Sequence, residues 1–151
     1  THLMAASPSN RKGQRSSIQT PIYRDLELLL RWEISVVDRL PKSLGYQELG
    51  RQAIRSTNES LTLVSLALKV EDDRAKSNAL GALFVQLENI KSVFRTLREL
   101  SKDPSKPRVL TEKQYLHFIE IINRISYQQY AWAGKYAQRP ESLDGDSSLN
   151  N

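Results

Sequence analysis

Apolar residues recur every three or four positions along four stretches of this chain, and this spacing constrains the fold more than any other feature. The longest stretch runs from residue 73 to about residue 101 and carries a nearly continuous apolar stripe of Leu80, Leu83, Phe84, Leu87, Ile90, Phe94 and Leu97. A repeat of 3.6 residues places such side chains on one face of an α-helix. No convincing strand-like alternation is present. The sequence therefore predicts an all-α fold.

Three further amphipathic helices are predicted, and their ends carry local signals. The first begins after Thr20, with Pro21 at the first helical position, and ends before Pro41. The second runs from about residue 44 to residue 70. The fourth begins at Thr111, which stands three residues before Gln114 in the spacing of a capping box. Four helices with short connections predict an antiparallel up-down-up-down bundle.

A shift in composition at each end separates this bundle from its flanks. Residues 1–19 are polar and basic, whereas residues 140–151 are polar and acidic. Segments of this kind bury too little apolar surface to offset the entropy lost on ordering. We therefore expect disordered tails at 1–19 and 140–151 around one domain at 20–139. Because Met4 is the only methionine, we interpret the first three residues as a cloning remnant.

Composition narrows the class of protein further. The 151 residues include no cysteine, which excludes a disulfide framework and any cysteine-based metal site. No apolar run approaches the roughly 18 residues that a membrane span needs, and no signal peptide is recognisable. We expect a cytoplasmic protein without membrane contact. The net charge of +5 permits contact with nucleic acid or an acidic protein.

Candidate catalytic groups are scarce. Apart from His2, the only histidine is His117, and Glu120 follows it in the reverse of the Glu-x-x-His order of di-iron bundles. A glycine-rich phosphate loop, a Gly-x-Ser-x-Gly motif and a His-Glu-x-x-His motif are all missing from the sequence. We predict a protein that is not an enzyme and has no cofactor or metal site. A bundle that binds a small ligand or a metal is the weakest alternative.

Basic residues form stripes that suggest a binding surface. The predicted third helix has four of them at positions i, i+4, i+7 and i+11, which share one face, and shorter pairs occur on the second and first helices; the eight candidates are Lys91, Arg95, Arg98, Lys102, Arg51, Arg55, Arg24 and Arg31. The alternative is an ordinary solvated face on which Glu88 and Glu99 pair with Lys91 and Arg95. If the stripes converge, phosphate contact is their natural use.

The later half of the predicted second helix has more apolar residues than one face can hold. In residues 61–70 they go most of the way around the helix, so either the helix is deeply buried or a second face meets another subunit. The predicted oligomer interface comprises Leu61, Leu63, Leu66 and Leu68.

Several short patterns between residues 20 and 136 together support a family resemblance. They are Tyr23-x-x-Leu26 with Trp32, Pro41-Lys42-x-x-Gly45-Tyr46-x-x-Leu49-Gly50-x-x-Ala53-Ile54, Leu97-Arg98-x-Leu100, Thr111-x-Lys113-Gln114-Tyr115, Ile122-x-x-Ile125 and a late Trp132. In this order they resemble the four-helix bundle proteins that include the accessory variability determinant of diversity-generating retroelements and the large-rRNA intervening-sequence proteins. The first of these two groups is the closer match.

The resemblance implies a function that periodicity alone does not. It implies a ring-like homo-oligomer, a homopentamer, that binds a reverse transcriptase and RNA or DNA and supports mutagenic retrohoming of template RNA. The alternative within the family is a generic nucleic-acid or protein interaction module of the rRNA intervening-sequence group, without a reverse-transcriptase partner.

Overall fold

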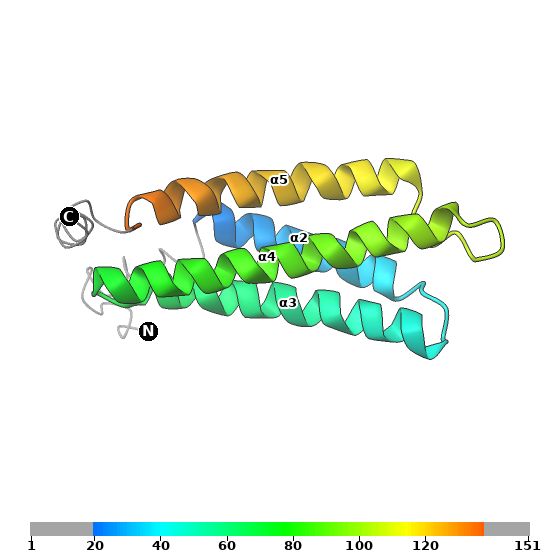
Figure 1. Cartoon of the computed structure of the whole chain (residues 1–151), viewed down its shortest axis with the longest axis horizontal. Helices are drawn as coiled ribbons and strands as arrows, with labels where there is room; N and C mark the ends of the chain where they lie inside the picture. Colours follow the sequence, from blue (N-terminus) through cyan, green and yellow to red (C-terminus); the bar gives the residue numbers. More distant parts are fainter. Residues whose placement is uncertain (1–19, 138–151) are drawn as a thin grey trace, which may run out of the picture.

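The computed structural model describes residues 20–137, which form four α-helices and no β-strand (Figure 1). These helices are α2 (Pro21–Val37), α3 (Leu44–Lys69), α4 (Asp73–Lys102) and α5 (Glu112–Gly134). The predicted all-α fold and its four-helix bundle are confirmed. The tails predicted at 1–19 and 140–151 lie outside the described residues, as do residues 138 and 139 of the predicted domain.

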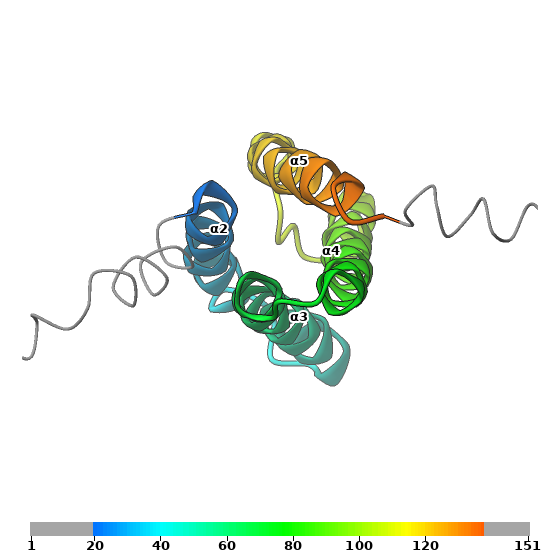
Figure 2. The same ribbon diagram turned by 90° about the vertical axis from the view of Figure 1, so that its left-hand side faces the viewer.

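Successive helices run in opposite directions along a common long axis (Figure 1). Seen end-on, α2, α3, α4 and α5 stand around a shared centre, and each contacts its neighbours in the chain while α5 returns to α2 (Figure 2). One end of the bundle holds the 38–43 and 103–111 connections, and the other holds the α3–α4 turn (Figure 1). None of the helices in the described part is long and apolar enough to cross a membrane.

The helix ends follow the local signals in the sequence. The Thr20 and Asp72 side chains accept hydrogen bonds from the third residue beyond them, at 3.4 and 2.9 Å. Before α5 both halves of the predicted capping box form, because Thr111 Oγ1 accepts from Gln114 N at 3.0 Å and Gln114 Oε1 accepts from Thr111 N at 2.9 Å. Helix α2 ends three residues before the predicted limit at Leu40, since residues 39 and 40 bond as tighter i→i−3 turns.

The core lies along the central axis and is built mainly by α2, α4 and α5. Its fully buried large side chains are Leu26, Leu29, Leu80, Leu83, Leu87, Ile90, Phe94, Leu97, Phe118, Ile121, Ile122 and Ile125. Aromatic side chains pack together within the core. The centre of the Phe94 ring lies 4.5 Å from that of Phe118 and 5.3 Å from that of Trp32. Phe84, predicted as part of this stripe, is half exposed, because it lies about 100° around α4 from Leu83.

Helix α3 presents small and polar residues to the core, which lets its backbone approach α2 and α4 closely. Its buried positions include Gly50, Ala53, Ser56, Thr57, Ser60 and Ala67. The closest approach is at Gly50, where an added Cβ would lie 2.8 Å from Val37 Cγ1. Only glycine therefore fits this helix crossing without displacing a neighbour.

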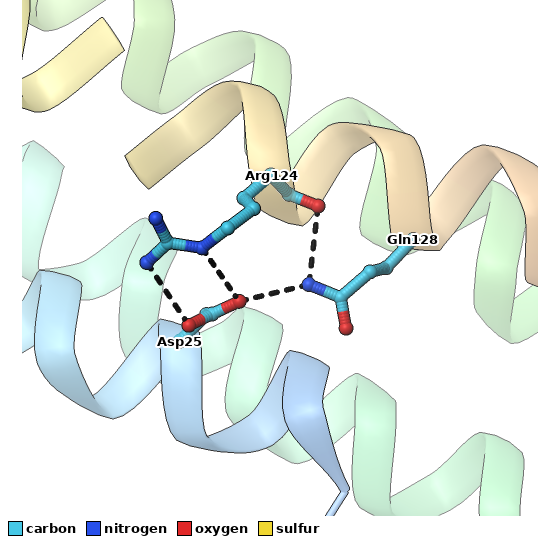
Figure 3. Close-up of polar contacts among 3 residues, drawn as sticks. All are labelled: Asp25, Arg124 and Gln128. Atoms are coloured by element: carbon cyan, nitrogen blue, oxygen red, sulfur yellow. Dashed lines mark hydrogen bonds and ion pairs between the residues drawn. The ribbon is translucent and has the colours of Figure 1, made fainter. Parts of the chain in front are cut away.

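Polar contacts close the bundle between α2 and α5. The Arg124 guanidinium donates to both carboxylate oxygens of Asp25, at 3.2 and 3.3 Å, and Gln128 Nε2 donates to the same carboxylate at 2.8 Å (Figure 3). Asp25 also raises the pKa of Arg124, by its hydrogen bond and its charge. The cluster fixes the register of the first and last helices, which are about 100 residues apart in the chain.

Candidate nucleic-acid interface

The four predicted basic residues of α4 lie on one side of that helix, away from its core face. Leu87, Ile90, Phe94 and Leu97 point into the core, whereas Arg95 and Lys102 are exposed and Lys91 and Arg98 are half-buried. This division follows from the 3.6-residue repeat, because the stripe and the apolar face are offset on the same helix. The sequence prediction of a continuous basic stripe agrees with this geometry.

Three of the four stripe residues have acidic partners. Lys91 lies 3.1 Å from Glu88, Lys102 lies 3.5 Å from Glu99, and Arg98 lies 3.0 Å from Glu112 of α5. Glu99 thus pairs with Lys102, not with Arg95 as the solvated-face alternative expects. Exposed ion pairs contribute less than about 1 kcal/mol, so a phosphate can displace the carboxylates.

Arg95 has no acidic partner among the described residues. It projects from the middle of the stripe, one turn from Lys91 and from Arg98. An exposed guanidinium without a carboxylate partner is available to a phosphate at no cost in broken ion pairs. Arg95 is therefore the first contact residue to test.

Arg98 also fastens α4 to α5. Its guanidinium contacts both carboxylate oxygens of Glu112 and lies 4.7 Å from the centre of the Tyr115 ring. The hydrogen bond to Glu112 is the main cause that raises the pKa of Arg98. These contacts place the basic stripe along the boundary between α4 and α5.

The stripe ends in a basic hollow of about 260 Å³ where α4 passes into α5. Its lining comprises Arg98, Ser101, Lys102, Arg108, Leu110, Thr111 and Glu112. The loop is ordered by Ser101 Oγ, which accepts hydrogen bonds from Val109 N at 3.1 Å and Leu110 N at 3.0 Å. Arg108 was not among the residues predicted from the sequence. The basic residues of Lys106-Pro107-Arg108, which follow the stripe directly, could have indicated that the basic surface continues into the loop.

Positive charge is concentrated at this end of the bundle. Segments 38–55 and 91–113, which lie around the two connections there, contain eleven lysine and arginine residues against five aspartate and glutamate residues. The rest of the described chain has seven basic and nine acidic residues. We call the first region the basic end. By its charge, this end is more favourable to a polyanion than the opposite end.

The eight predicted binding residues do not form one patch. Arg51 and Arg55 line a shallow hollow of about 440 Å³ made only of α3 residues, and Arg51 pairs with Glu48 at 3.5 Å. Arg24 and Arg31 are exposed on α2. The residues that the structure brings together are those of α4 with Arg108.

The predicted oligomer interface on α3 is mostly inside the subunit. Leu63 is only 8% exposed and belongs to the core, while Leu61 and Leu68 pack against the core. Most of these apolar side chains are buried or partly buried because α3 lies between α2 and α4 and packs against both helices. Leu66, which is 45% exposed, is the remaining free member. An interface between subunits at this helix stays a prediction that depends on Leu66.

The described part of the chain contains one buried acid. Glu33 is fully buried, and burial raises its pKa to about 8 although a hydrogen bond from Thr57 opposes the shift. His117 is exposed and has its ring 6.0 Å from that of Trp32. In the described part of the chain no three His, Asp or Glu residues are grouped as metal ligands.

Neither protein-family models, nor curated proteins, nor solved structures match this chain. The resemblance drawn from the sequence therefore stays a prediction. The interpretation of the site depends on its own geometry, which is a row of exposed and half-buried cations leading to a basic hollow.

Proposed function

We propose that this protein is a non-catalytic binding protein whose basic end engages the phosphate backbone of a nucleic acid. The observation that carries the proposal is the row of Lys91, Arg95, Arg98 and Lys102 along α4, which leads to Arg108 in the adjoining hollow. Lysine and arginine neutralise phosphates without reading bases, so the binding would be tolerant of sequence and sensitive to salt.

The finer role we propose is that of an accessory protein of a diversity-generating retroelement. In that role the chain, as a ring-like homo-oligomer, binds the reverse transcriptase together with template RNA or its cDNA. The family resemblance supports this proposal, and Arg98 and Lys113 of that resemblance lie at the basic end. A reverse-transcriptase gene with paired template and variable repeats beside this gene would support it. Their absence would favour an interaction module of the rRNA intervening-sequence group.

Charge reversal at matched positions tests the binding surface. We expect a triple variant with Arg95→Glu, Lys102→Glu and Arg108→Glu to lose at least about tenfold in affinity for RNA or DNA. The matched control reverses Lys69, Arg74 and Lys135, which are exposed near the opposite end and change the net charge equally. Fluorescence anisotropy with labelled oligonucleotides measures both affinities. Equal losses in the two variants would contradict a localised site, and absence of binding by the unaltered protein would refute the proposal.

A further inference from the structure

Three exposed aromatic rings on α4 and α5 belong neither to the core nor to the cation row. Phe84 is 51% exposed, Tyr127 is 72% exposed and Tyr130 is 76% exposed. Large aromatic side chains contribute most of their free energy when their faces are covered. The exposed rings therefore mark a surface that is suited to a flat, stackable ligand.

Phe84 continues the basic stripe along α4. It precedes Lys91 by seven residues and Arg95 by eleven, spacings that return to the same side of a helix. Arg98, further along the same side, contacts Glu112 and Tyr115 of α5. Phe84 therefore stands on the side of α4 that borders α5, at the other end of the stripe from the basic hollow.

The two tyrosines lie on α5 beside the same part of α4. Gln129 Nε2 donates to Leu80 O at 2.9 Å, which sets the register between the two helices. Tyr127 and Tyr130 flank Gln129 in the sequence, and Phe84 follows Leu80 by one turn. Tyr130 lies about 100° and Tyr127 about 200° around α5 from Gln129, so both rings stand on the outward side of α5, at the level of Phe84 along the bundle.

The outer side of α5 around the tyrosines carries little charge. Leu116, Asn123, Tyr127 and Tyr130 are uncharged exposed positions on this side, at spacings of three, four and seven residues, and Glu120, between Leu116 and Asn123, is the exposed acid among them. Arg124 of the same helix is held toward α2 by Asp25 (Figure 3). The exposed surface of α4 and α5 consequently has an aromatic part, around the tyrosines and Phe84, and a cationic part along the rest of α4.

We propose that this surface binds single-stranded nucleic acid, with unpaired bases stacked on Tyr127, Tyr130 and Phe84 and phosphates on the cations of α4. The inference rests on the proposed function and names its substrate class. In a duplex the base faces are already stacked on one another, so exposed rings add affinity only for single strands. From Phe84 to Lys102 the helix rises about 27 Å, enough for several nucleotides.

A binding assay with matched oligonucleotides separates the aromatic part from the cationic part. We measure the affinity of the full-length protein for a labelled single strand and for the duplex of the same sequence, by anisotropy. The double variant Tyr127→Ala/Tyr130→Ala should lose roughly five- to a hundredfold for the single strand and less than about twofold for the duplex. The variant Tyr127→Phe/Tyr130→Phe keeps both rings and should bind as the unaltered protein does.

Each outcome decides the inference. Because both tyrosines are largely exposed, the alanine variant should keep its helical circular dichroism and melting temperature, and Leu28→Ala/Ile34→Ala, at two partly exposed positions of α2, provides a control for apolar surface. Equal affinity for single strand and duplex, unaffected by the loss of the tyrosine rings, would overturn the inference and leave the proposed function standing. If no oligonucleotide binds and a protein partner is lost on the same substitutions, both are overturned.

Discussion

Glu33 is a carboxylate at a position where the helix repeat calls for an apolar residue. It falls between Leu29 and Val36 on the buried side of α2, and Thr57 Oγ1 of α3 donates a hydrogen bond to its carboxylate at 2.8 Å. In the sequence, Glu33 is recognisable as the one polar residue at an otherwise apolar position of the first helix. The partner was not predictable, because Thr57 reaches Glu33 only through the packing of α3 on α2.

The raised pKa of Glu33 predicts a specific dependence of stability on pH. Folded Glu33 holds its proton up to about pH 8, whereas the unfolded chain releases it near the ordinary pKa of 4.5. The stabilisation is therefore complete below about pH 4.5 and is lost as the pH rises to about 8, by an amount on the order of a few kcal/mol. Urea denaturation between about pH 4 and pH 8.5 measures this loss.

The substitution Glu33→Gln isolates this effect from other titrating groups. Glutamine retains an acceptor for Thr57 and cannot ionise, so the variant should be more stable than the unaltered protein at pH 8 and similar to it at about pH 4. Glu59→Gln, at an exposed position of α3, should leave the pH dependence unchanged. An unchanged pH slope in Glu33→Gln would contradict a protonated, buried Glu33.

At the scale of single elements, most helix boundaries follow from local chemistry. The capping box at Thr111 was predicted from two residues and forms as expected. Phe84 was wrongly assigned to the core. It lies at the edge of the apolar stripe of α4, and the sequence does not show which edge of that stripe the neighbouring helices cover. For the apolar surplus on α3 the sequence left deep burial and a subunit interface open, and the structure buries Leu63 and leaves Leu66 exposed.

Two glycines should respond oppositely to alanine. Alanine is preferred to glycine inside a helix by about 1 kcal/mol, so Gly81→Ala in α4, where nothing lies within 4 Å of the added Cβ, should be stabilising by that order. Gly50→Ala should be destabilising by roughly 1–3 kcal/mol, because its Cβ meets Val37 at 2.8 Å. Chemical denaturation of both variants provides the comparison. Stabilisation by Gly50→Ala would show that α2 and α3 can separate freely.

Removal of the α5 cap should weaken the end of the bundle that carries the basic hollow. Thr111→Ala leaves Gln114 N without its acceptor and should cost about 1 kcal/mol in the free energy of unfolding. Thr96→Ala, on the exposed side of α4, is the control and should change stability by less, since alanine favours the helix. A larger loss in the control would count against the cap.

At the scale of the whole molecule, the bundle was predictable and the distribution of its cations was not. Periodicity defined four helices, and short connections defined their antiparallel order. Each basic stripe was also visible. Whether the stripes meet depends on the rotation of every helix about its axis, and packing directs Arg51 and Arg55 of α3 away from the stripe of α4. Arg108 joins that stripe only because the loop folds back on Ser101.

The salt dependence of nucleic-acid affinity tests the central claim most directly. For a single strand the slope of log affinity against log salt is about −0.7 for each phosphate neutralised. The unaltered protein should show a steep slope, and the triple reversal of Arg95, Lys102 and Arg108 should flatten it by about two, while the control triple at the opposite end keeps it. A slope near zero in the unaltered protein, or equal slopes in the three proteins, would contradict a phosphate-binding basic end.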